Sequence, residues 1–354
     1  MTYNNDRYAI IMAGGVGSRF WPESTEQQPK QFLDLTGSGK SLLRQTFERL
    51  EHIIPANHII IVTNEKYAGK VKKQLPEIDN RNILLEPVMR NTAPAILYAV
   101  NHIHASNPDA NIIVAPSDHF IDNEDAFHHD VIQAFDFASK HDVLITLGIH
   151  PDSPHTGYGY IQYDKKREKN GFFKVIEFTE KPDKKTAEKF LEQGNFLWNA
   201  GIFIWNVKNI RTAFKKYLPE MFQALESDTY QTEREQDFIN KVFPNVENIS
   251  IDYGIMEKAA NVWVRPAHFG WNDLGSWDAL YKQLSTQNKE NISLGGQLFH
   301  KNATGNLIKT PTGKKIILSG LDDYLIIDSG EILMIIPKSE AQEVKNWHNK
   351  LNKK

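Results

Sequence analysis

The chain has 354 residues, of which 40% are hydrophobic and 24% are charged, and a formal net charge of −3. The composition is that of a globular protein, and the chain is long enough for one large and one small domain. Because the chain has no cysteine, it can form no disulfides, thiolate nucleophiles or thiolate metal sites. The sequence has no cluster of basic residues except Lys353-Lys354, so nucleic-acid binding is not expected. The N-terminus is polar, and no apolar run approaches the roughly 20 residues that a membrane span needs. These features predict a cytoplasmic protein without membrane contact.

The first half of the chain alternates strand and helix patterns. Apolar runs rich in β-branched residues predict buried strands at 8–12, 58–63, 82–86, 111–116 and 143–148. Patterns between them predict helices at 42–50, 94–106 and 126–140. Such an alternation predicts an α/β fold with a Rossmann-like mixed, mostly parallel sheet covered by helices. Ligands of these sheets bind beyond the carboxyl ends of the strands.

From residue 157 onward the pattern changes to aromatic-rich strands and hairpins, among them a strand at 198–205. Amphipathic patterns predict further helices at 183–193, 208–226 and 233–242. A polar stretch at 285–293 suggests a boundary between a large domain, residues 1–284, and a C-terminal domain, residues 285–354.

The predicted C-terminal domain consists of short β-type runs separated by glycine-containing turns. The close spacing of these turns suits a few coils of a β-solenoid. Ser339 and Gln342 have the spacing of a capping box, which predicts that a final helix begins beside them and continues through Leu351.

A glycine-rich stretch, residues 14–17, directly follows the first predicted strand. Glycine lets the backbone approach a ligand closely and point successive N–H groups at an anion. Arg19 would offer a planar fork to phosphate oxygens, and Lys30 a point charge. The alternative is a tight turn followed by two solvated cations, and the glycines alone do not separate these two readings.

Asp118, just past the strand predicted at 111–116, and Asp273, ahead of a short helix, are candidate metal ligands. Mg²⁺ is commonly held by one or two carboxylates and completes its octahedron with phosphates and water. Taken alone, each aspartate fits a turn or helix cap better. Convergence of the two carboxylates on one ion would explain both positions.

Polar residues within two apolar segments of the second half are further candidate site residues. Glu180 and Lys181 precede Pro182, which ends a predicted strand, and the alternative to a shared role is a solvated ion pair. Asn199 lies among apolar residues, where either sugar hydroxyls or a structural hydrogen bond would satisfy its amide.

Glu86 ends the strand predicted at 82–86. An ionised carboxylate only accepts hydrogen bonds, so it matches guanine, which presents two adjacent donors. An amide would instead suit a pyrimidine edge, where a donor and an acceptor alternate. The alternative is an incidental surface charge beside a helix N-terminus.

Eight motifs, in order along nearly the whole chain, resemble those of the mannose-1-phosphate guanylyltransferases, or GDP-mannose pyrophosphorylases, a family of sugar nucleotidyltransferases. Each motif is weak alone, but the ordered set is specific. Trp21-Pro22 and residues 90–94 resemble the guanylyl branch rather than the thymidylyl or uridylyl branches. Glu23 departs from the leucine that is common there. The motifs are residues 14–22 (GGVGSRFWP), 29–32 (PKQF), 86–94 (EPVMRNTAP), 115–119 (APSDH), 178–182 (FTEKP), 198–201 (WNAG), 250–254 (SIDYG) and 273–277 (DLGSW).

The resemblance implies a nucleotide-diphospho-sugar transferase fold with a short left-handed β-helix-like C-terminal domain. It implies that GTP and α-D-mannose 1-phosphate react, with Mg²⁺, to give GDP-mannose and pyrophosphate. The implied catalytic residues are Arg19, Lys30 and Lys181. The implied nucleotide-binding residues are Gly14, Gly15, Gly17, Ser18 (through its backbone), Arg19, Glu86, Asn91 and Thr92. The implied sugar-phosphate site comprises Gly157, Glu180, Lys181 and Asn199, and the implied metal ligands are Asp118 and Asp273.

Two other functions stay open. One is another hexose-1-phosphate nucleotidyltransferase that takes UTP or dTTP, and the other is a non-catalytic regulatory subunit that binds a nucleotide sugar. The intact Arg19, Lys30, Asp118, Lys181 and Asp273 argue against the second. The C-terminal domain could form a homodimer contact, as such tails do in relatives, or pack within one chain.

Overall fold

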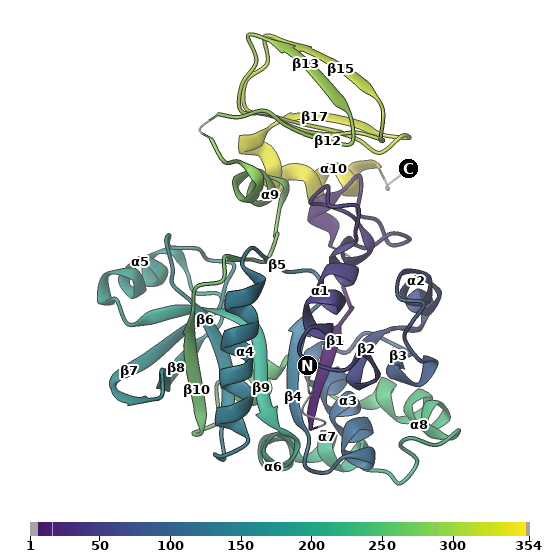
Figure 1. Ribbon diagram of the computed structural model, residues 1–354, viewed down its shortest axis with the longest axis vertical. Coiled ribbons are helices and arrows are strands. Elements are labelled where there is room, and N and C mark those ends of the chain that lie inside the picture. The colour runs from purple at the N-terminus through teal and green to yellow at the C-terminus, as the bar shows by residue number, and fades with distance from the viewer. Residues whose placement is uncertain (1–5, 16, 288, 352–354) are drawn as a thin grey trace. The chain divides into compact units, whose positions relative to one another are not determined.

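The computed structural model describes residues 6–15, 17–287 and 289–351, and the chain divides into two compact units (Figure 1). The first unit comprises Met1–Gly14, Phe47–Ser117 and Ile121–Trp271, and the second comprises Gly15–Thr46, Asp118–Phe120 and Asn272–Lys354. The predicted division into a domain of residues 1–284 and a domain of residues 285–354 stays a prediction. In the described part of the chain, no helix is long and apolar enough to span a bilayer.

A nine-stranded sheet is the centre of the described first unit, in the order β3-β2-β1-β4-β9-β6-β10-β8-β7. The strands β1 to β4 are mutually parallel, as are β6 and β10, whereas β9 runs antiparallel to β4 and β6. The predicted mixed, mostly parallel sheet is therefore confirmed. The bounds are β1 (Arg7–Met12), β2 (Ile59–Asn64), β3 (Ile83–Glu86), β4 (Asn111–Pro116), β6 (Leu144–Ile149), β7 (Tyr160–Lys169), β8 (Phe172–Thr179), β9 (Phe196–Asn206) and β10 (Val262–Ala267).

Helices cover both faces of this sheet. Ile10 and Ile112 share a buried cluster with α3 and α6, and side chains alternate between faces along a strand. Helix α4 packs against β4, β6, β9 and β10 outside that cluster, and so covers the other face. The helices of this unit are α2 (Ala68–Gln74), α3 (Thr92–Ser106), α4 (Glu124–Ala138), α5 (Lys184–Gln193), α6 (Val207–Tyr217), α7 (Pro219–Ala224) and α8 (Glu235–Val242), and α1 (Leu42–Glu51) is divided equally between the two units.

The single helix predicted at 208–226 is wrong, because the structure has two helices, α6 and α7, on either side of Leu218. Pro219 has no N–H to donate and its ring clashes with the preceding turn, so α6 ends before it. Proline is well tolerated at the first position of a helix, and α7 begins there.

The second unit contains a small β region with a repeating path. The strands β12, β14 and β16 pair in parallel, and β13 pairs in parallel with β15, so the chain alternates between two sheets. This pairing agrees with the predicted solenoid coils, and their left-handed sense stays a prediction. The elements are α9 (Trp277–Leu284), β12 (Ile292–Leu294), β13 (Gln297–Lys301), β14 (Leu307–Lys309), β15 (Lys315–Ser319), β16 (Tyr324–Asp328), β17 (Leu333–Pro337) and α10 (Val344–Leu351), and short strands β5 (Phe120–Ile121) and β11 (Trp271–Asn272) lie where the chain passes between units.

The predicted capping box is wrong. Residues Lys338–Glu343 form a 3₁₀ helix, and α10 begins only at Val344, so Ser339 lies inside a helical turn. Pro337, with its extended backbone, ends β17 and starts this turn.

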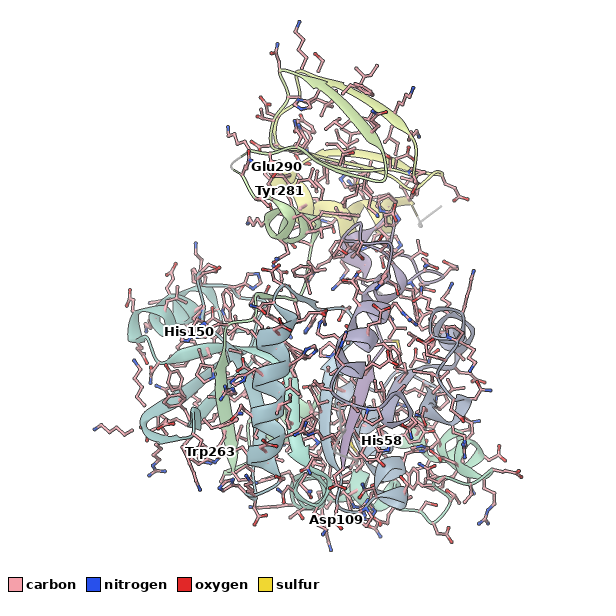
Figure 2. The ribbon with its side chains drawn as sticks, viewed as in Figure 1. His58, Asp109, His150, Trp263, Tyr281 and Glu290 are labelled. Carbon is pink, nitrogen blue, oxygen red and sulfur yellow. The ribbon has the colours of Figure 1, made fainter. Side chains whose placement is uncertain are left out.

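The apolar core of the second unit joins the glycine-loop segment to the C-terminal β region. Phe20, Trp21, Trp277 and Val344 belong to one buried cluster. Trp277 packs edge-to-face on Phe20 with ring centroids 4.9 Å apart, and its Nε1 donates to the Trp21 carbonyl oxygen at 3.1 Å. Figure 2 shows Tyr281 and Glu290 in this unit, where the Tyr281 hydroxyl donates to the Glu290 carbonyl oxygen at 2.9 Å.

Candidate active site

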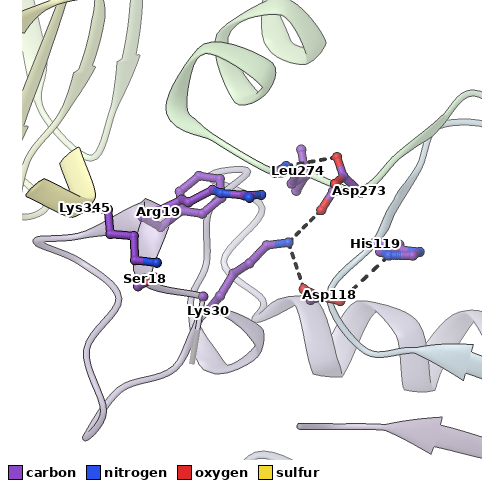
Figure 3. A pocket seen from close by; sticks show the side chains of 11 residues that line it. Ser18, Arg19, Lys30, Asp118, His119, Asp273, Leu274 and Lys345 are labelled. Atoms are coloured by element: carbon purple, nitrogen blue, oxygen red, sulfur yellow. Dashed lines mark hydrogen bonds and ion pairs between the residues drawn. The ribbon is translucent and has the colours of Figure 1, made fainter. Parts of the chain in front are cut away.

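A pocket of about 350 Å³ lies within the second unit and brings together most of the predicted phosphate and metal residues (Figure 3). Its lining includes five polar segments that are distant in sequence. Gly14 and Gly15 are not among the lining residues. The residues that line the pocket are Gly17, Ser18, Arg19, Phe20, Lys30, Asp118, His119, Asp273, Leu274, Gly275 and Lys345.

Lys30 is the buried cation of this pocket, with a side chain only 6% exposed. Its Nζ donates to Asp118 Oδ2 at 2.9 Å and to the Asp273 carbonyl oxygen at 2.7 Å. An ammonium has three donors, so these two bonds fix its position and leave one N–H for a ligand. Lys30 is therefore both structurally anchored and able to bind a phosphate oxygen.

Gly17 permits this arrangement. Its φ is +67°, and a Cβ added there would lie 2.4 Å from Lys30 Cβ. Any side chain at this position would be strained and would displace Lys30. The glycine is thus required by close approach to Lys30 as well as by the left-handed turn.

Arg19 lies in the 3₁₀ helix Ser18–Phe20 and is exposed at the pocket. The following residues Phe20 and Trp21 are buried and hold the turn in place. Within residues 6–15, 17–287 and 289–351, no hydrogen bond or ion pair engages the Arg19 guanidinium. Its planar fork is therefore available to an anion.

The two aspartates line the same pocket, and their carboxylates suit Mg²⁺ by donor type. Burial raises the pKa of Asp118, but the charges of Lys30 and His119 and the hydrogen bond from Lys30 outweigh it, so the net pKa lies below its ordinary value. Asp273 Oδ1 accepts from the Gly275 N–H at 3.0 Å. The described residues contain no cluster of three or more metal-type ligands. Two carboxylates nevertheless fit Mg²⁺, which takes its other ligands from phosphates and water.

In the first unit, Glu86 ends β3 and is 6% exposed. Burial raises its pKa to about 7. The Asn64 side chain donates to the Glu86 carbonyl oxygen at 3.0 Å, but within the described part of the chain nothing forms a hydrogen bond or ion pair with the Glu86 carboxyl. A buried polar group without a partner is costly, so this carboxyl is suited to a ligand that donates hydrogen bonds.

Asn91 and Thr92 form the N-terminus of α3 near Glu86 in sequence. Asn91 has a φ of 66°, and its side-chain oxygen accepts from the Thr92 N–H at 3.0 Å. Thr92 Oγ1 accepts from the Ile251 N–H at 2.9 Å. Both residues thus have a structural role as helix cap and tether, and the Asn91 amino group and the Thr92 hydroxyl proton remain available to a ligand.

The predicted sugar-phosphate residues also belong to the first unit. Lys181 pairs with Glu180 and has a φ of 47°. Burial lowers the pKa of Lys181, but Glu180 and the charge of Asp252 outweigh it, so the net pKa lies above its ordinary value. Gly157 is exposed, and its N–H donates to His155 Nδ1 at 3.2 Å.

Asn199 is held from both ends of its amide. Its Oδ1 accepts from Thr146 Oγ1 at 3.0 Å and from the Gly201 N–H at 3.1 Å, and its Nδ2 donates to Asp252 Oδ1 at 3.0 Å. The predicted structural hydrogen bond therefore exists. One amide N–H remains for a sugar hydroxyl.

Asp252 is a candidate site residue for which the sequence predicted no role. It begins the π-helix Asp252–Met256, a distortion that is frequent at functional sites. Burial, and then the charge of Glu180, raises its pKa to about 6. Its motif at 250–254 was a signal, but only the contact with Asn199 indicates what the carboxylate does.

Backbone strain marks the same segments. Asn91, Lys181 and Leu274 have positive φ values although they are not glycine. Left-handed non-glycine residues cost energy and cluster at binding and catalytic sites. Each of the three lies in a predicted site segment, but five other described non-glycine residues with positive φ lie elsewhere, so the strain alone does not identify the site.

Comparison with known proteins agrees with this geometry. The family model for nucleotidyl transferases matches residues 8–290. Mannose-1-phosphate guanylyltransferase from Escherichia coli is 34% identical over 95% of this chain and 74% of its own length, and mannose-1-phosphate guanylyltransferase RfbM from Salmonella typhimurium is 35% identical over 95% and 70%. A crystal structure from Thermus thermophilus, described as a mannose-1-phosphate geranyltransferase, covers 98% of this chain and 99% of its own at 30% identity and a TM-score of 0.89. The chain belongs to the nucleotidyl transferase family, in the group of the mannose-1-phosphate guanylyltransferases.

Proposed function

We propose that this enzyme catalyses the reaction of GTP with α-D-mannose 1-phosphate to GDP-mannose and pyrophosphate. The observation that carries the proposal is the pocket in which Lys30 joins the Asp118 carboxylate to the Asp273 carbonyl oxygen, beside the Arg19 guanidinium, which pairs with none of the described residues. Such a constellation suits phosphoryl chemistry, which depends on positioning and charge neutralisation rather than on a covalent residue. The names of the relatives supply the substrates.

In the proposed reaction an oxygen of the sugar phosphate attacks the α-phosphorus of GTP in line. The bond from the α-phosphorus to the oxygen that bridges it to the β-phosphate breaks, and pyrophosphate leaves with that electron pair. Arg19 stabilises the departing pyrophosphate, and the remaining N–H of Lys30 stabilises charge on the α-phosphate. Asp118 and Asp273 would hold Mg²⁺, which neutralises phosphate charge when bound.

The sugar phosphate is bound by residues of the first unit. Lys181 contacts its phosphate, and Glu180, Asn199 and the backbone of Gly157 bind mannose hydroxyls. Asp252 orients the Asn199 amide through the hydrogen bond to its Nδ2. The Asn199 amide N–H can donate a hydrogen bond and the Glu180 carboxylate can accept one, and the hydroxyls of a sugar both accept and donate.

Guanine is read by Glu86, and Glu86→Gln is expected to reduce the preference for GTP over UTP by about one to two powers of ten. The carboxylate accepts from two guanine donors, whereas an amide presents one donor and one acceptor. The ratio of kcat/KM values for the two nucleotides measures the effect. Unaltered selectivity would mean that the base is read by other residues.

A pH series provides the control for Glu86. Because its pKa is near 7, GTP binding by the wild type should weaken by up to about tenfold per pH unit below 7, relative to the variant. The stability of the folded protein should instead be greater at low pH than at high pH. A folded pKa above the ordinary 4.5 stabilises the protein fully below pH 4.5, and this contribution is lost as the pH rises to 7. Glu86→Gln should remove both dependences.

We further propose a homodimer through the C-terminal β region. Phe299 and Ile317 are register partners on β13 and β15, and are 49% and 85% exposed. Adjacent exposed apolar side chains of this kind suit burial against a second copy. Light scattering should give the mass of two chains for the wild type and of one for Ile317→Glu, whereas Ile176→Glu, at an exposed position of β8, should stay dimeric. A monomeric wild type would contradict this.

A substrate panel tests the proposed activity. Pyrophosphate release should be fastest with GTP and mannose 1-phosphate, and slower with UTP or dTTP or with glucose 1-phosphate. A preference for UTP or dTTP would identify the alternative transferase, and nucleotide-sugar binding without turnover would identify a regulatory subunit. The proposed substrates are cytoplasmic metabolites, so we propose a cytoplasmic location as well.

A further inference from the structure

The C-terminal helix α10 packs directly on the turn that carries Arg19. Val344 is fully buried in the cluster that contains Phe20 and Trp21, and the His348 ring lies edge-on to Trp21 with centroids 6.0 Å apart. Two contacts one turn apart fix the rotation of the helix about its axis. The direction of its other side chains relative to the turn is thereby set.

Lys345 follows the buried Val344 and lines the same pocket as Arg19 and Lys30. Figure 3 shows its side chain extending from α10 toward Ser18, on the side of the pocket where Arg19 lies. It is exposed, and in the described part of the chain its ammonium takes part in no hydrogen bond or ion pair. An unneutralised ammonium at the wall of a phosphate pocket is placed to bind an anion.

Lys345 changes the balance of charges in the lining of the pocket. Arg19 and Lys30 are balanced by Asp118 and Asp273, and Lys30 is paired with Asp118. Lys345 adds a further positive charge to the described lining. Triphosphate and pyrophosphate carry several negative charges, so they favour this added positive charge.

We propose that Lys345 is a phosphate-binding residue of the nucleotide pocket, which binds the terminal phosphates of the nucleoside triphosphate and the pyrophosphate formed from them. The C-terminal helix thereby contributes directly to the substrate site. The identity of the ligand rests on the proposed function, whereas the phosphate affinity can be measured without turnover.

The test compares Lys345→Met with Lys350→Met. Methionine keeps an unbranched apolar stem and removes the charge. Lys350 is on the same helix outside the pocket, with its Nζ 4.4 Å from the centre of the Trp347 ring, and so controls for lost helix charge. Calorimetric titration with Mg²⁺-pyrophosphate should give about tenfold weaker binding for Lys345→Met, since one charge-assisted hydrogen bond is lost, and unchanged binding for Lys350→Met. Lys345→Arg should restore most of the affinity.

Steady-state kinetics provide the second readout. Lys345→Met should raise the KM for GTP about tenfold and leave the KM for mannose 1-phosphate unchanged. Equal pyrophosphate affinity in Lys345→Met and the wild type would overturn the proposal, as would equal losses in the two methionine variants. A wild type that binds pyrophosphate in this charge-dependent way but transfers nothing to mannose 1-phosphate would instead overturn the proposed function alone.

Discussion

Arg19→Ala is expected to lower turnover by about two to three powers of ten, the scale for loss of one preorganised donor to a developing charge. The guanidinium lines the phosphate pocket and engages no described residue, so its binding capacity is left for substrate. Pyrophosphate is the leaving group, and charge builds on it as the bond to the α-phosphorus breaks. The measurement is kcat at saturating GTP and mannose 1-phosphate.

Stability separates this effect from a folding defect. Because Arg19 is exposed and unpaired in the described chain, its replacement should change the free energy of unfolding by less than about 0.5 kcal/mol. Arg234→Ala is the matched control, since Arg234 is also exposed and its guanidinium forms no hydrogen bond or ion pair within the described residues. Near-normal turnover of Arg19→Ala would remove this residue from the chemistry.

Asp118→Asn is expected to have two effects. The concentration of Mg²⁺ for half-maximal activity should rise by at least about tenfold, because a charged ligand becomes neutral. The free energy of unfolding should fall by roughly 1–3 kcal/mol, because the buried Lys30 ammonium loses the charge that balances it. A metal titration and a denaturant titration measure these effects separately.

The stability loss of Asp118→Asn should depend on pH. The pKa of Asp118 is below its ordinary 3.8 in the folded chain, so its stabilisation is present above pH 3.8 and is lost as the pH falls through the folded value. The stability deficit of Asp118→Asn should therefore shrink in acid. Asp125→Asn, an exposed carboxylate in the first turn of α4, should behave as the wild type. An unchanged Mg²⁺ titration of Asp118→Asn would defeat the metal role.

The sheet could be predicted because its strands are short, apolar and bounded by breakers. The runs at 8–12, 58–63 and 111–116 each lie on a strand of the first unit. Burial on both faces leaves such strands without polar positions, and this pattern is local to the sequence. The helix break at Pro219 was equally local and could have been predicted from the proline.

The meeting of Lys30, Asp118 and Asp273 depends on contacts across 243 positions of sequence, which local patterns cannot specify. Motif resemblance supplied these residues instead. It supplied no role for Asp252, because a carboxylate's partner is visible only once the π-helix has placed it beside Asn199. Lys345 had no sequence signal, since a lysine on the exposed face of a terminal helix is ordinary.

The most direct test of the central claim follows the α-phosphate of GTP. Incubation of the wild type with GTP labelled at that phosphate and with mannose 1-phosphate should place the label in GDP-mannose, with one unlabelled pyrophosphate released per sugar nucleotide formed. The transfer should require Mg²⁺ and should nearly vanish in Arg19→Ala. Label that remains in GTP, or that appears in GMP or GDP independently of the sugar phosphate, would contradict the account.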